Sequence, residues 1–154
     1  MEWSPQFYAW RAGDGCPSCA EGRPDETPWG LRFFAGTVAD AYLVRADVQR
    51  GLSIVVWRGR HAVEPTELSD LEAAAYGREV LMVGRALRDA FAPVKLNYNV
   101  LGNSVPHLHT HLIPRYADDP RPGWPFPFLD PEPGPMPEPR LTRDAERLRA
   151  ALTG

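Results

Sequence analysis

The sequence is poor in features that mark several large classes of protein. It has only 2 cysteines, and a structural disulfide between them is not expected in a reducing cytoplasm. No apolar run approaches the ~20 residues that a transmembrane helix needs, so no membrane association is expected. There is also no basic excess, because 17 Lys and Arg face 20 Asp and Glu, for a formal net charge of -3. That balance argues against a protein that binds nucleic acid polymers, although a local pocket for a small anion stays compatible with it.

The N-terminal residues lack a basic segment followed by an apolar one, so no secretory signal is predicted and the cytoplasm is the expected location. A length of 154 residues suits a single domain over 1–154 with its own core. Residues 1–29 are rich in Pro, Gly and charge, and we expect them to be irregular apart from a turn that carries the cysteines. A proline-dense tail over 118–140 is expected to follow an extended or irregular path.

Hydrophobic patterns predict about five short strands and two helices. The strands are expected over residues 29–34, 42–44, 52–57, 95–100 and 106–114, with a tight turn at Gly102-Asn103 between the last two. The strongest helix signal covers 70–91, where Ser69 and Glu72 match a capping box and Pro93 ends the pattern. A short charged helix is predicted over 142–152.

Histidine is scarce, but 3 of the 4 histidines alternate within His107-Leu108-His109-Thr110-His111. On a strand, alternate residues share a face and lie about 6.6–7 Å apart. The outer two rings therefore start about 13 Å apart, whereas zinc–nitrogen bonds are only about 2.0–2.1 Å long. A single ion does not easily collect all three rings, so we expect the histidines to divide between different roles.

A zinc site is the first of these roles. Cys16 and Cys19 form a Cys-x-x-Cys motif, which fits a redox pair, half of a zinc site or a coincidence. Together with His61 and His107 they complete a tetrahedral Cys2His2 set, with thiolate and imidazole ligands that suit Zn2+. The alternative is that the cysteines are unligated and His61 is a surface residue.

Phosphate chemistry is the second role, left to His109 and His111. A neutral imidazole is nucleophilic near pH 7, and it can attack phosphorus to form a phosphoramidate. Several donors to phosphate oxygens flank the row. They are Asn97, Asn99, Asn103, Ser104 and Arg115.

The sequence resembles the histidine triad (HIT) family of nucleotide hydrolases and transferases, in its zinc-containing bacterial type. The family pattern alternates histidine with apolar residues, and here it reads from His107 to Ile113, with Thr110 in place of one apolar residue. Gly102-Asn103-Ser104-Val105 resembles the segment that precedes the triad in the family. The likeness covers about residues 30–118, which we expect to be the core of the domain.

The resemblance implies an α+β fold, in which a long helix packs on an antiparallel sheet, and a homodimer formed through that helix and a sheet edge. The middle histidine, His109, is then the nucleophile, with His111, Ser104 and Asn103 at the phosphate. It also implies a structural Zn2+ on Cys16, Cys19, His61 and His107. Asp47 is the candidate for the ribose, with a turn-capping role as the alternative.

We therefore predict a nucleotide hydrolase or nucleotidyl transferase that acts at an α-phosphate through a nucleotidyl-histidine intermediate. Dinucleoside polyphosphates and nucleoside phosphoramidates are the expected substrates, and Mg2+ can accompany a polyphosphate. Two alternatives stay open. One is a metal-dependent hydrolase that uses triad histidines as ligands, and the other is a zinc-stabilised nucleotide-binding module without turnover.

Overall fold

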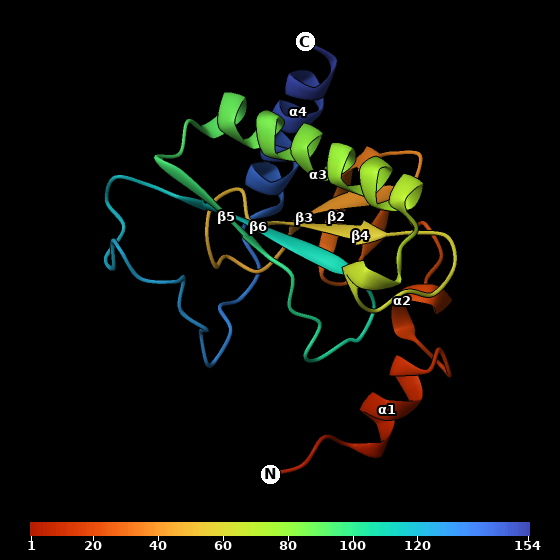
Figure 1. Cartoon of the computed structure of the whole chain (residues 1–154). Helices are drawn as coiled ribbons and strands as arrows, with labels where there is room; N and C mark the ends of the chain where they lie inside the picture. The colour runs from red at the N-terminus through yellow and green to blue at the C-terminus, as the bar shows by residue number, and fades with distance from the viewer.

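One antiparallel sheet forms the centre of the protein in a computed structural model that describes all residues from 1 to 154 (Figure 1). Its strands are β1 Glu26–Thr27, β2 Gly30–Ala35, β3 Ala39–Val44, β4 Ser53–Trp57, β5 Lys95–Asn99 and β6 His109–Arg115. The 6 strands lie in the order β1-β2-β3-β4-β6-β5. This confirms the predicted α+β class, with one strand more than expected because the short β1 pairs with β2.

The protein also has four α-helices and one 3-10 helix. They are α1 Pro5–Arg11, α2 Pro17–Ala20, η1 Pro65–Glu67, α3 Asp70–Phe91 and α4 Glu138–Thr153. The long helix α3 has its predicted bounds, because Ser69 accepts from Glu72 N–H while the Glu72 carboxylate accepts from Ser69 N–H. At its other end Ala92 adopts a left-handed conformation with φ of 46° just before Pro93.

The prediction of an irregular 1–29 segment was wrong in part. Ser4 caps α1 by accepting a hydrogen bond of 3.1 Å from the Phe7 N–H, and Pro5 and Pro17 each occupy the first position of a helix. Figure 1 shows α1 extending away from the body of the molecule. No helix of the protein combines the length and the apolar character needed to cross a membrane.

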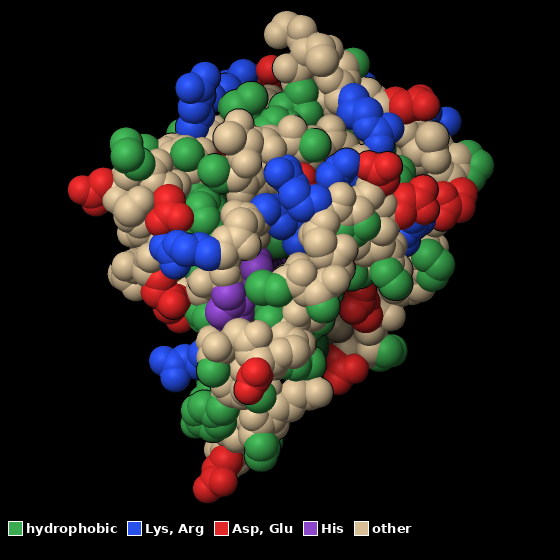
Figure 2. Space-filling model, turned by 90° about the vertical axis from the view of Figure 1, so that its right-hand side faces the viewer, with side chains coloured by type: hydrophobic (Ala, Val, Ile, Leu, Met, Phe, Trp, Pro, Cys, Tyr) green, Lys and Arg blue, Asp and Glu red, His purple; other side chains and the backbone are tan.

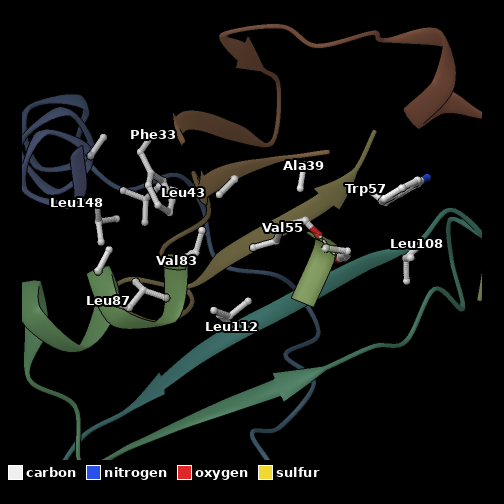
Figure 3. Close-up of a cluster of buried hydrophobic side chains, with 14 of the residues drawn as sticks. Phe33, Ala39, Leu43, Val55, Trp57, Val83, Leu87, Leu108, Leu112 and Leu148 are labelled. Atoms are coloured by element: carbon white, nitrogen blue, oxygen red, sulfur yellow. Dashed lines mark hydrogen bonds between the residues drawn. The ribbon is translucent and has the colours of Figure 1, made fainter. Parts of the chain in front are cut away.

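The main core lies on the sheet face that α3 and α4 cover. Val83 and Leu87 of α3 and Leu148 of α4 meet Val55 and Leu112 of the sheet, and all five are fully buried (Figure 3). Burial of such aliphatic side chains stabilises the fold by about 1.5–3 kcal/mol each. Because α3 and α4 take this face, the opposite face of β4 and β6 is left for other contacts.

The register of β6 decides which face the histidines use. Thr110, between two histidines, is buried toward α3, where its hydroxyl lies 2.8 Å from the Tyr76 hydroxyl, which also donates to the Val55 carbonyl. Alternate residues of a strand face opposite sides, so His109 and His111 lie on the side away from α3. Thr110 therefore replaces an apolar residue without leaving its buried hydroxyl unpaired.

The connection between β5 and β6 is longer than the predicted tight turn. It runs from 100 to 108, and β6 begins at His109 rather than at residue 106. The reason is the backbone of Leu108, whose carbonyl accepts from Trp57 N–H while its N–H donates to the Ala62 carbonyl. This pairing draws residues 107–108 toward the segment after β4, where His61 lies.

Candidate functional site

The backbone carbonyl of His107 sets the protonation of the His109 ring. Nδ1 of His109 lies 2.6 Å from this carbonyl oxygen, which can only accept, so Nδ1 carries the hydrogen. Nε2 is then the unprotonated nitrogen with a free lone pair. Burial lowers the pKa of His109, and the bond to the His107 carbonyl partly opposes this shift, so the ring is neutral at pH 7.

His111 lies beside His109 on the same face, with ring centroids 5.1 Å apart. Burial lowers the pKa of His111 to about 4, and the neighbouring His109 adds to the effect. Its Nδ1 is buried and has no hydrogen-bond partner. The second ring is therefore a neutral polar group that lies next to His109.

The first histidine of the row faces a different set of residues. The ligand atoms of Cys16, Cys19, His61 and His107 all lie within 4.8 Å of one another. Nδ1 of His107 is 3.4 Å from Cys16 Sγ and 3.5 Å from Cys19 Sγ, and Nδ1 of His61 is 3.4 Å from Cys19 Sγ. These four residues come together as the sequence predicted, and His109 and His111 belong to no such cluster.

Both imidazoles of this cluster are held in the tautomer that a metal requires. Nε2 of His107 lies 2.6 Å from the Trp57 carbonyl, and Nε2 of His61 lies 3.1 Å from the carbonyl of Arg11, the last residue of α1. Each Nε2 therefore donates, and each Nδ1 presents its lone pair toward the sulfurs. A zinc tetrahedron with two sulfur and two nitrogen ligands has S···N edges of about 3.5 Å, so the residues fit this ion.

A buried ion-pair network fixes the cysteine segment to the sheet, and sequence reasoning missed it. The buried Arg58 side chain donates to the Asp40 carboxylate of β3 at 3.0 Å and to the Ser18 carbonyl between the cysteines at 3.1 Å. Arg23, close to the cysteines in sequence, donates to the other Asp40 oxygen at 2.7 Å. The available signal was Asp40 itself, a charged residue between two alanines in an otherwise apolar strand.

A pocket of about 420 Å³ opens beside His111, on the histidine face of the sheet. Its floor is the small apolar cluster of Val44, Leu52 and Ile113. One wall comes from residues 126–129 and 132 of the proline-dense tail. We call residues 121–136 the strap. Figure 2, which looks at the side of the molecule opposite the strap, shows histidine side chains at the surface with Lys and Arg side chains above them.

Of the other residues that the sequence analysis placed at the substrate, only some line this pocket. Asn99 pairs with His111 across β5 and β6 and lines the pocket. Asn97 pairs with Ile113 and lines a neighbouring cavity, where its side-chain oxygen accepts 2.9 Å from Arg115. Asn103 and Ser104 are exposed in the loop from 100 to 108 that precedes the row.

Asp47 is not among the residues that line the pocket. Its carboxylate forms an ion pair with Arg140 of α4, and its N–H donates 2.8 Å to the Gly134 carbonyl of the strap. The structure therefore does not bring Asp47 together with the histidines, although its neighbour Val48 does line the pocket.

Comparison with known proteins supplies the family. The HIT domain family model matches residues 42–118, from β3 to just past β6. The chain belongs to the HIT family. This family match includes all three histidines of the row, whereas both cysteines lie outside it.

Individual HIT proteins show how far the likeness extends. "Protein hit" of Bacillus subtilis is 36% identical over 82 residues, which are 50% of this chain and 56% of that protein, so the match spans little more than half of that relative. A histidine triad protein of Sinorhizobium meliloti has a solved structure that is 28% identical, with a TM-score of 0.68 over 79% of this chain and 89% of that one.

A second solved HIT structure also covers the N-terminal segment. The Zn-bound HIT family protein of Mycobacterium smegmatis matches 97% of this chain and 94% of its own, with a TM-score of 0.59 and 22% identity. At that identity the likeness shows the fold alone.

Proposed function

We propose that this HIT protein is a nucleotide-binding hydrolase or nucleotidyl transferase that acts at an α-phosphate. The observation that carries the proposal is the hydrogen bond of 2.6 Å between Nδ1 of His109 and the His107 carbonyl. It leaves Nε2 of His109 unprotonated on the open face of the sheet, as a nucleophile must be. Dinucleoside polyphosphates and nucleoside phosphoramidates are the proposed substrates.

In the first step, the Nε2 lone pair attacks the α-phosphorus and forms a P–N bond. The bond from phosphorus to the leaving oxygen or nitrogen breaks, and the leaving group keeps the electron pair and takes a proton from water. In the second step, water or another acceptor attacks phosphorus, the P–N bond breaks, His109 regains its lone pair, and the proton of the attacking group returns to the solvent. His111, Ser104 and Asn103 are proposed to contact the phosphoryl oxygens as negative charge develops on them.

The pocket beside His111 suits the nucleoside part of such a substrate. Its floor and its walls are mostly apolar, and Asn99 lies at its histidine end. A flat base gains free energy by leaving water for this surface, while the phosphate stays next to the histidines. A nucleoside bound in this pocket would bring its α-phosphorus, rather than the distal end of a polyphosphate, near His109.

Substitution of the nucleophile tests the proposal. His109→Ala is expected to lose about 1,000-fold or more in kcat on adenosine phosphoramidate and on diadenosine tetraphosphate, because no other group supplies the attacking nitrogen. Thr110→Val is the control, since Thr110 faces α3 and touches no substrate group. Mass spectrometry of wild-type protein quenched in base should find a nucleotidyl adduct on the peptide with His109. Turnover by His109→Ala at the wild-type rate would refute the mechanism.

We also propose that Cys16, Cys19, His61 and His107 hold a structural Zn2+. The ion would supply a rigid cross-link between the N-terminal segment and the start of β6. Support comes from the ligand atoms, which lie within 4.8 Å of one another, and from the two Nε2 donors that fix both tautomers. We assign no Mg2+ site to the chain, so this ion would arrive as the counter-ion of a polyphosphate. A reducing compartment such as the cytoplasm suits free thiolates as ligands.

A homodimer through β5 and α3 completes the proposal. The strand β5 is at the edge of the sheet, with β6 as its one neighbour. Tyr98 of β5 and Val94 just before the strand are exposed, and Leu81 is exposed on the adjacent face of α3. A built Cβ at Gly84 would lie 2.6 Å from the Tyr98 hydroxyl, so glycine lets the strand pack closely against α3. An exposed edge with apolar neighbours favours pairing with a second copy.

A further inference from the structure

The strap is fixed at its beginning by a buried arginine. Arg115 is 7% exposed, and its guanidinium donates to the carbonyl of Trp124 at 2.8 Å and to the carbonyl of Arg121 at 3.1 Å. The same side chain pairs with Asp119. A guanidinium that collects two backbone carbonyls and a carboxylate holds an otherwise irregular segment in one path.

The strap is fixed at its end by backbone pairing. The N–H of Met136 donates 2.8 Å to the Arg45 carbonyl, and the Gly134 carbonyl accepts 2.8 Å from Asp47 N–H. Met136 is itself buried in the main core. The strap therefore crosses the sheet between two anchors, and Figure 1 shows it on the side away from α3.

Between these anchors the strap forms a wall of the pocket. Phe126 packs against the apolar floor, and it also lines the neighbouring cavity of about 730 Å³, so it separates the two. Pro127, Phe128 and Leu129 continue the wall. Proline restricts the backbone of this segment, which lowers the entropy lost when a ligand is bound against it.

Glu132 of the strap is the one carboxylate in the pocket lining, which is otherwise mostly apolar. A carboxylate there can only accept hydrogen bonds, so it suits a ligand that carries donors. Asp47, the acidic residue that the sequence analysis proposed for the ribose, forms an ion pair with Arg140 instead. On a nucleoside the donors are the sugar hydroxyls and an exocyclic amino group of the base.

We infer that the strap is a fixed selectivity wall for the nucleoside, and that Glu132 accepts a hydrogen bond from a sugar hydroxyl or a base amino group. This inference rests on the proposed function, because it places a nucleotide in the pocket. Glu132 would then determine specificity from the strap, a segment that contains no histidine.

Binding of three ligands tests the inference without requiring turnover. Calorimetry would compare AMP, its 2',3'-dideoxy analogue and purine riboside monophosphate, which lacks the amino group. Glu132→Gln is expected to weaken AMP binding about 10-fold, because a hydrogen bond to a charged acceptor is lost. The same substitution should leave unchanged the affinity for whichever analogue lacks the recognised donor. Phe126→Ala is expected to weaken all three ligands alike.

Asp130→Asn is the matched control, because Asp130 lies in the strap but does not line the pocket. If Glu132→Gln binds all three ligands as the wild type does, the inference is wrong. A loss of discrimination in Asp47→Asn instead of Glu132→Gln would also overturn it. Failure of the wild-type protein to bind AMP would overturn the proposed nucleotide function together with this inference, whereas the first two outcomes leave that function standing.

Discussion

At the scale of single residues, three histidines of one strand differ because their hydrogen-bond partners differ. His107 donates through Nε2 to the Trp57 carbonyl and so offers Nδ1. His109 donates through Nδ1 to the His107 carbonyl and so offers Nε2. His111 has a buried Nδ1 with no hydrogen-bond partner. Backbone carbonyls therefore decide which ring nitrogen can bind a metal and which can attack phosphorus.

Removal of His111 should change how stability depends on pH. Burial lowers the pKa of His111 to about 4, below the ~6.5 of an unfolded chain. As the pH falls, His111 therefore takes up a proton in the unfolded chain before it does so in the folded protein. The contribution of His111 to stability is fully present above pH ~6.5 and is lost as the pH falls toward 4. Between pH 7 and pH 5, the unfolding free energy of the wild type should therefore fall by roughly 1–2 kcal/mol more than that of His111→Asn.

Urea unfolding at several pH values between 7 and 5 would measure this difference. The protein should be saturated with zinc throughout, so that the Cys/His cluster contributes equally to both curves. Parallel curves for the wild type and His111→Asn would contradict the assignment of a neutral, buried His111.

At the scale of elements, two segments outside the family match complete the site. The N-terminal segment with α1 and α2 brings Cys16 and Cys19 to the start of β6, and Arg58 with Asp40 holds it there. The strap closes one side of the pocket. The central sheet therefore carries the histidine row, whereas the two flanking segments add the cysteines of the Cys/His cluster and a wall of the pocket.

Removal of zinc should destabilise the N-terminal segment. Protein purified without chelator is expected to contain about one zinc per chain, and Cys19→Ser should contain little, because a thiolate ligand is lost. Returning free zinc to apoprotein at about 1,000 times its Kd should stabilise the fold by about 4 kcal/mol. Metal analysis and thermal unfolding measure the two effects, with Ser18→Ala as control. Full stability and intact cysteines in a zinc-free protein would argue against the site.

At the scale of the whole molecule, the sheet is covered by helices on one face and carries the histidines on the other. The exposed edge β5 and the near end of α3 are then free to meet a second copy. Pairing of two β5 strands would extend the antiparallel sheet across both chains and cover the exposed Tyr98 and Leu81.

Introducing charge at this edge should separate the two chains. Tyr98→Arg is expected to shift the protein from dimer to monomer in sedimentation experiments, because like charges would face each other across a two-fold interface. Leu71→Arg is the control, since Leu71 is 85% exposed at the opposite end of α3. A wild-type protein that sediments as a monomer at high concentration would rule out the proposed dimer.

Much of the fold was predictable because its signals are local. The capping box at Ser69 and Glu72 and the stop at Pro93 gave the bounds of α3, and these agree with the structure. The irregular path of residues 100–108 was not predictable, because it depends on bonds from Leu108 to the distant Trp57 and Ala62. The short helices of the N-terminal segment were missed because each has little apolar periodicity.

The sequence by itself determined the residue types and the faces of the histidine strand, since alternation is a local property of an extended chain. It also contained all four residues of the Cys/His cluster. Only the tertiary structure decided that Asp47 pairs with Arg140, that Arg58 anchors the cysteine segment and that Glu132 lines the pocket. These contacts join segments far apart in the chain, so no local pattern specifies them.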